Sequence, residues 1–86
     1  MITMNWVPKQ YKHMIEEVSC FCGNLEVLLK EGWYAAGYNE TIWLFNLEHY
    51  DSGDYTEQEI RQDLHDWLDH VEPDVDGYHY NLGLKP

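Results

Sequence analysis

Acidic side chains form the most distinctive chemical pattern in this 86-residue chain. Eleven of them lie between residues 48 and 76, where Arg61 is the single basic residue. They are Glu48, Asp51, Asp54, Glu57, Glu59, Asp63, Asp66, Asp69, Glu72, Asp74 and Asp76. Carboxylates at this density could serve solubility, bind a cation or bind a basic partner. The formal net charge of −11 therefore arises mainly in one stretch of the chain.

Two regular rows occur within this stretch. The first row steps by three ahead of a predicted helix and contains Glu48, Asp51, Asp54 and Glu57. The second row steps by four, three and three along that helix and contains Glu59, Asp63, Asp66 and Asp69. Helix neighbours at such steps have Cβ atoms about 5–6 Å apart, and DNA phosphates repeat on a comparable scale, with a rise of about 3.4 Å per nucleotide. The two rows could therefore imitate a phosphate backbone and compete for the Lys and Arg side chains of a nucleic-acid-binding protein.

A plainer interpretation is that the acids only solvate a helix face, as charge runs commonly do. Two features favour a basic partner instead. A solvated helix usually mixes charges of both signs, whereas this one has almost no basic residues, and the acidic residues continue through the segments on either side of it. Both interpretations stay open from the sequence alone.

Other chemistries find less support in the sequence. The segment 72–77 partly matches an EF-hand loop, but Gly83 stands where the bidentate glutamate belongs. His65 and His70 are five residues apart, and the two cysteines do not complete the spacing of a zinc site. The chain has no glycine-rich phosphate loop and no nucleophile elbow. We therefore expect no metal, no cofactor and no enzymatic activity, and the negative charge disfavours direct binding of nucleic acid.

An amphipathic helix is predicted for the first part of the chain, beginning after Pro8. Its apolar stripe steps by threes and fours, with a weak point at Gly23-Asn24 and an end at Gly32. The stripe contains Tyr11, Met14, Ile15, Val18, Phe21, Cys22, Leu25, Leu28 and Leu29. Cys20 and Cys22 would then point to different faces of one helix, so we expect two reduced thiols, with Cys22 in the core.

Two aromatic-rich segments, 33–38 and 41–47, predict a β-hairpin with Asn39 in its turn. Trp43 and Phe45 would share one face of the second strand, and Ile42 and Leu44 the other. Both faces are apolar, so either the sheet is covered on both sides or one face is an exposed patch for a partner.

A second helix is predicted to begin at Glu57, because Thr56 and Glu59 form a capping box. Its buried stripe contains Ile60, Leu64, Trp67, Leu68 and Val71, and Pro73 would end it. A third strand could follow at 78–82. The expected fold is one α+β domain spanning residues 1–86, of order α-β-β-α with a possible final strand. Two amphipathic helices would pack with a short antiparallel sheet.

The composition agrees with a small folded domain. Four Trp, seven Tyr and two Phe offer large buried areas in a short chain. No apolar run is long enough to span a bilayer, and the first residues lack the pattern of a secretory signal. We therefore expect a cytoplasmic protein.

Small size, acidity, aromatic content and one acidic helix face together resemble the small inhibitors that phages and plasmids encode against host defence enzymes. These include DNA-mimicking anti-CRISPR and anti-restriction proteins. The resemblance implies a phage protein that acts inside the bacterial host cell by occupying a basic nucleic-acid-binding surface of a CRISPR effector or restriction enzyme. The expected contact residues are the two acidic rows together with Trp43 and Phe45.

A second resemblance is confined to Asp54-Tyr55-Thr56-Glu57 and Glu59, which is similar to a helix opening in colicin DNase immunity proteins. It implies an all-helical immunity protein that binds a bacteriocin nuclease. A third interpretation, from the residues themselves, is an adaptor module that binds through the aromatic hairpin.

Overall fold

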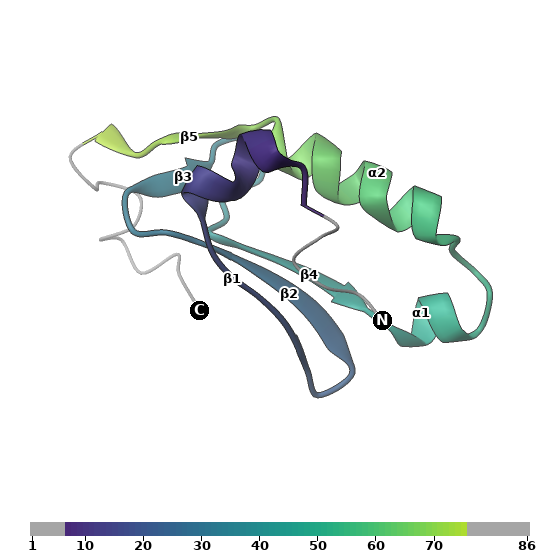
Figure 1. The fold of residues 1–86 in the computed structure, drawn as a ribbon. Coiled ribbons are helices and arrows are strands. Elements are labelled where there is room, and N and C mark those ends of the chain that lie inside the picture. The colour runs from purple at the N-terminus through teal and green to yellow at the C-terminus, as the bar shows by residue number, and fades with distance from the viewer. Residues whose placement is uncertain (1–6, 76–86) are drawn as a thin grey trace.

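The computed structural model describes residues 7–75 and shows a small α+β domain (Figure 1). Its elements in chain order are the 3₁₀ helix η2 (Lys9–Met14), β1 (Ile15–Phe21), β2 (Asn24–Leu29), β3 (Trp33–Ala35), β4 (Ile42–Asn46), α1 (Glu48–Asp51), α2 (Glu57–Leu68) and β5 (Val71–Pro73). Strands β1, β2 and β4 form an antiparallel sheet in the order β1-β2-β4, and β3 pairs with β5 in a separate two-stranded sheet. No helix in this part of the chain is long and apolar enough to cross a membrane.

The predicted first helix is wrong. Only η2 is helical there, and the rest of the segment forms the β1–β2 hairpin. Cys22 and Gly23 connect the strands with backbone φ angles of 51° and 78°. Two consecutive residues with positive φ produce a tight hairpin turn whose twist matches the flanking strands. The dipeptide interpreted as a weak point in a helix is therefore part of the end of a hairpin.

The misleading helical period has a structural cause. In β2 the buried residues are Leu25, Val27 and Leu29, which alternate as one face of a strand requires. In β1 the register shifts directly after Ile15, so the next inward residue is Val18, three positions later. Such a bulge changes a step of two into a step of three, which matches the spacing of an apolar stripe on a helix.

The prediction that the cysteines lie on one helix with Cys22 in the core is wrong. Both thiols are free, as expected, but Cys20 lies on β1 and Cys22 in the hairpin turn, and both residues are exposed. Gly32 is likewise not a helix end, since it lies between β2 and β3 with a φ angle of 92°.

The predicted hairpin at 33–47 is correct only in part. Strands β3 and β4 occur within the predicted ranges, and Asn39 has the expected positive φ of 56°. The two strands belong to different sheets, however, because β4 pairs with β2 and β3 pairs with β5. A single bridge between Ala35 and Glu40 is what remains of the expected hairpin.

Helix α2 begins at Glu57 with the predicted capping box. Thr56 Oγ1 accepts from the backbone N–H of Glu59, and Glu59 Oε1 accepts from the backbone N–H of Thr56. The helix ends at Leu68, earlier than expected, and Val71 lies on β5. Pro73 is the last residue of that strand and does not end the helix. The predicted strand at 78–82 lies outside the described residues.

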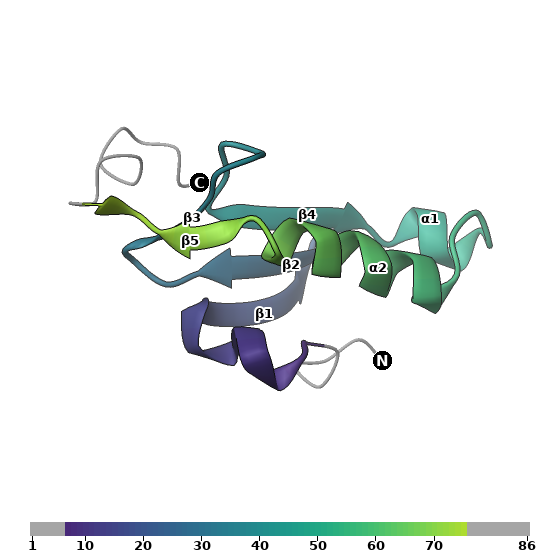
Figure 2. The same cartoon turned by 90° about the horizontal axis from the view of Figure 1, so that it is seen from above.

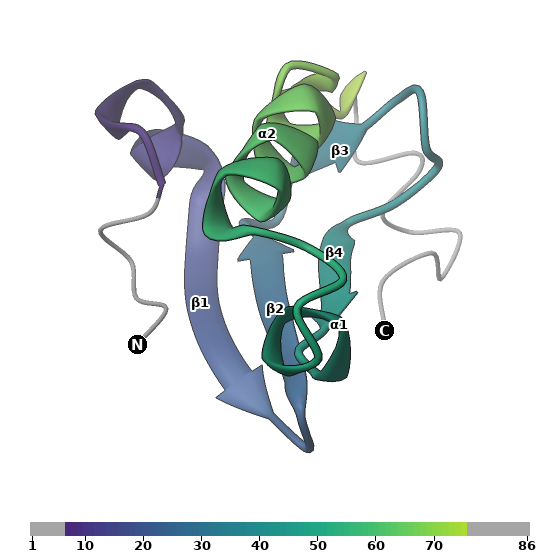
Figure 3. The same cartoon turned by 90° about the vertical axis from the view of Figure 1, so that its right-hand side faces the viewer.

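The core lies between α2 and one face of the three-stranded sheet. Seen from above, α2 runs between β2 and β4 (Figure 2), and the end-on view places it on the same side as β3 (Figure 3). The buried residues of α2 are Ile60, Leu64, Trp67 and Leu68, as the predicted stripe required. Leu25, Val27 and Trp43 meet this stripe from the sheet. Tyr11 and Met14 of η2 complete the core beside it.

Candidate functional site

All eight acidic residues of the two predicted rows are exposed on α1, on α2 and on the residues beside these helices. They are Glu48, Asp51, Asp54, Glu57, Glu59, Asp63, Asp66 and Asp69. Arg61 lies among them and forms an ion pair with Glu57, with a distance of 2.9 Å from Nη2 to Oε1. This pair is exposed and joins residues one turn apart, so it contributes only a few tenths of a kcal/mol, about 0.3–0.5. The surface defined by these eight residues, named here the acidic face, carries a strongly negative charge.

The two aromatic residues expected at the surface have different positions. Trp43 is 5% exposed and belongs to the core, and Phe45 is half-buried. Both side chains face α2, because they pair with the inward residues Val27 and Leu25 of β2. The expected patch of Trp43 and Phe45 is therefore largely covered. On the opposite face of β4, Leu44 is 56% exposed.

Three carboxylates of α2 also have structural contacts. Glu59 Oε1 accepts from Thr56 in the capping box, and Asp63 Oδ2 accepts from the indole N–H of Trp43 at 3.0 Å. Asp66 Oδ1 accepts from the Gln62 amide at 2.9 Å. In each carboxylate one oxygen makes these bonds, and the other makes none with residues 7–75. The three side chains are thus held in position, each with one oxygen left for another donor.

A groove of about 580 Å³ runs between α2 and β4 and connects the acidic and aromatic residues. Its lining contains Leu44, Phe45, Asn46, His49, Tyr55, Glu59, Ile60, Gln62, Asp63 and Asp66. The apolar part that faces α2 comes from Phe45 and Ile60, and the charged part from Glu59, Asp63 and Asp66. The sequence suggested two separate surfaces, one formed by the acidic residues and one by the aromatic residues of β4. In the structure, residues of both sets line one concave site.

Three rings form an edge-to-face cluster at one end of this groove. The centroids of Phe45 and Tyr55 are 5.7 Å apart with an interplanar angle of 89°, and those of His49 and Tyr55 are also 5.7 Å apart. Phe45 lies parallel to Trp43 on the side toward the core, at 6.0 Å and 10°. Such offset and edge-on arrangements favour ring packing. The ring cluster is therefore anchored to the core through Trp43, although Tyr55 is itself 44% exposed.

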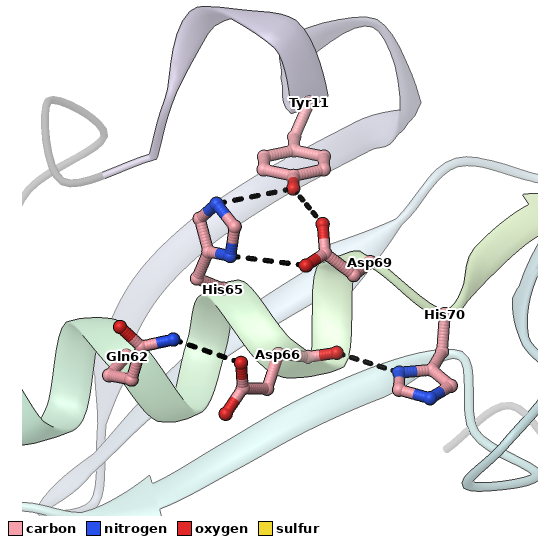
Figure 4. Close-up of polar contacts among 6 residues, drawn as sticks. All are labelled: Tyr11, Gln62, His65, Asp66, Asp69 and His70. Carbon is pink, nitrogen blue, oxygen red and sulfur yellow. Dashed lines mark hydrogen bonds and ion pairs between the residues drawn. The ribbon is translucent and has the colours of Figure 1, made fainter.

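A second polar cluster lies at the other end of α2, where η2 meets the helix (Figure 4). The Tyr11 hydroxyl donates to Asp69 Oδ1, and His65 Nδ1 lies 3.3 Å from Asp69 Oδ2. His65 Nε2 lies 3.4 Å from the Tyr11 hydroxyl. Burial, with the hydrogen bond to Asp69 as a further cause, raises the pKa of the Tyr11 phenol above its ordinary value. The cluster therefore joins η2 to α2 through a neutral tyrosine.

Within residues 7–75, His65, Asp66 and Asp69 are the group whose side chains could hold a metal ion. One ligand atom from each lies within 4.8 Å of the others. Histidine and carboxylate ligands suit several divalent metals. In this arrangement, however, both oxygens of Asp69 and one oxygen of Asp66 already have polar partners within the protein (Figure 4). The geometry is thus explained by contacts within the protein.

The spacing in the sequence could have revealed the pair His65 and Asp69, which are four residues apart on one helix. It could not have revealed Tyr11, which is 54 positions before His65. Spacing in the sequence could not have revealed the groove either, because the groove depends on β4 lying beside α2. Comparison of the chain with protein-family models, with curated proteins and with solved structures found no match.

Proposed function

We propose that this protein is a non-enzymatic inhibitor that binds the basic, nucleic-acid-binding surface of a bacterial defence enzyme or nucleic-acid-processing complex. Its acidic face would take the place of DNA phosphates, and the partner's Lys and Arg side chains would bind it. The target class would include CRISPR effectors and restriction enzymes, and the site of action would be the cytoplasm of the host cell. No cofactor, metal or direct contact with nucleic acid is part of this proposal.

One observation carries the proposal: eight exposed carboxylates gather on one helical region that contains a single Arg. Hydrogen bonding within the protein requires acceptor oxygens at Glu59, Asp63 and Asp66, but an amide would supply these equally well. The negative charge adds self-repulsion to a small domain. The fold does not need the negative charge of these carboxylates, whereas binding of a basic partner would.

The burial of Trp43 weakens the adaptor interpretation. An adaptor that binds through Trp43 and Phe45 needs these rings at the surface, whereas the structure directs both toward α2. The presence of a three-stranded sheet also departs from the all-helical fold implied by the resemblance to colicin DNase immunity proteins. Both observations favour the acidic face as the binding surface.

The test uses two triple variants with the same change in net charge. The first variant is Glu59→Gln, Asp63→Asn and Asp66→Asn, which removes charge while keeping the hydrogen-bond acceptors. The matched control neutralises three exposed acids that do not belong to the acidic face and consists of Glu16→Gln, Glu17→Gln and Glu31→Gln. Equal overall charge in the two variants makes local position the variable that the comparison measures.

Tagged wild-type and variant proteins are incubated with bacterial lysate at low and high salt, with and without short duplex DNA as competitor, and the captured proteins are identified. We expect nucleic-acid-binding proteins that are released by salt and by DNA, because screening weakens such charge contacts. The first triple variant should lose them and the control should retain them. Capture that resists both salt and DNA, or that is equal for the two variants, would refute the proposal.

A further inference from the structure

We infer that the groove between α2 and β4 is an arginine-binding site for the basic partner, so that the protein selects arginine over lysine. This inference rests on the proposed function and adds a specificity that a uniform negative field would not have. The ligand would be an extended, arginine-bearing segment of that partner. A second copy of this chain fits poorly, because its net charge of −11 repels another copy.

The groove combines aromatic rings and carboxylates, the two kinds of group that a guanidinium binds. A guanidinium is planar, weakly hydrated and able to stack on an aromatic ring while it donates to carboxylates. Phe45 and Tyr55 supply the rings, and Glu59 and Asp63 supply the carboxylates in the same groove. A lysine ammonium could use the charge but would benefit less from the planar surface. The chemistry of the groove thus matches arginine better than lysine.

Two carboxylates of the groove are already held in position before a partner binds. Glu59 Oε1 and Asp63 Oδ2 are held by hydrogen bonds to Thr56 and Trp43, which fixes the direction of each carboxylate. Their other oxygens make no bond with the described residues. Binding would therefore require little additional ordering of side chains, which is a major cost of association.

The spacing of the carboxylates along α2 is close to the spacing of side chains on one side of an extended chain. From the helical rise of about 1.5 Å per residue, Glu59 and Asp63 lie about 6 Å apart along the axis. Alternate residues of an extended chain lie about 7 Å apart and point to the same side. A segment with arginine at alternate positions could therefore place neighbouring guanidinium groups at neighbouring carboxylates. Asp66 continues the same lining for a further basic side chain.

The test measures binding of two short synthetic peptides to the full chain by fluorescence anisotropy. One peptide has arginine at alternate positions separated by glycine, and the other has lysine at the same positions. We expect the arginine peptide to bind roughly two- to fivefold more tightly, as a cation–π gain of about 0.5–1 kcal/mol implies. Tyr55→Leu should remove most of that preference. Tyr50→Leu is the matched control, since Tyr50 is similarly exposed but does not line the groove.

An NMR measurement locates the bound peptide. The indole N–H signal of Trp43, assigned from Trp43→Phe, should shift on addition of the arginine peptide, because its acceptor Asp63 gains a second donor. Equal affinities for the two peptides, or an arginine preference unchanged by Tyr55→Leu, would overturn the inference. If the first triple variant still weakens both peptides in that case, the acidic face is the binding surface and only the arginine site fails. If that variant weakens neither peptide, the proposed function fails as well.

Discussion

Replacement of Trp67 by alanine tests the core on which the candidate site is built. Trp67 is 2% exposed at the centre of the buried stripe of α2, and its indole N–H donates to Glu40 Oε2 at 2.8 Å. Truncation of a buried tryptophan to alanine costs about 3–5 kcal/mol. At about 0.05–0.15 kcal/mol per residue, an 86-residue domain has about 4–13 kcal/mol in total. Trp67→Ala should therefore remove between a quarter and all of the free energy of unfolding.

The assay is urea denaturation followed by far-ultraviolet circular dichroism, which does not depend on the tryptophan signal that the substitution removes. Trp67→Phe keeps an aromatic ring but loses the hydrogen bond to Glu40, so it should cost less, about 1–3 kcal/mol. Leu44→Ala is the control at an exposed position and should stay within about 0.5 kcal/mol of wild type. A loss below about 1 kcal/mol in Trp67→Ala would refute the placement of α2 on the sheet.

Three further predictions concern single contacts. Thr56→Ala should lower the free energy of unfolding by about 1 kcal/mol through loss of the helix cap, whereas Thr56→Ser should not; equal values from urea denaturation would contradict the cap. Burial raises the pKa of Tyr11, and burial with the charge of Asp74 raises that of Tyr34. The folded state therefore holds both phenol protons more tightly, and stability should be full below about pH 10 and fall as pH rises through the folded pKa values. Tyr11→Phe and Tyr34→Phe should each reduce this alkaline loss, measured as the free energy of unfolding against pH, and an unchanged slope would contradict the reasoning. Cys22→Asn should stabilise the hairpin by on the order of 1 kcal/mol, because asparagine tolerates the positive φ of the turn; a gain of the same size from Cys20→Asn, on a strand, would contradict this reason.

Local chemistry decided which elements could be predicted from the sequence. The start of α2 was predictable because Thr56 and Glu59 are close in sequence and satisfy each other's backbone groups. The β1–β2 hairpin was missed because the bulge after Ile15 and the turn at Cys22 together imitate a helical period. Asparagine before Gly23 would have been a strong hairpin signal, but cysteine is not one.

The acidic residues of the candidate site could be predicted from the sequence, but the groove that they line could not. Exposure of the acidic face followed from the positions of the acids off the apolar stripe of α2. The groove forms because β4 lies beside α2. This position of β4 depends on its pairing with β2, although β3 lies between the two strands in the sequence. The bond between Trp43 and Asp63 spans 20 positions, and no local spacing rule indicates such a contact. Trp43 was therefore assigned to a surface when it belongs to the core.

Glu59, Asp63 and Asp66 each provide a hydrogen-bond acceptor to the fold and a negative charge to the surface. A substitution by lysine would remove both at once. A lysine at Glu59 would break the capping box, and one at Asp63 would leave the indole of Trp43 without its acceptor. Loss of binding in such a variant could then reflect damage to α2 or to β4. Glutamine and asparagine preserve the acceptor and remove only the charge. The fold needs the hydrogen-bond acceptors of these side chains, and the proposed partner needs their negative charge. A loss of binding in the amide variants would therefore report the loss of charge and not damage to the fold.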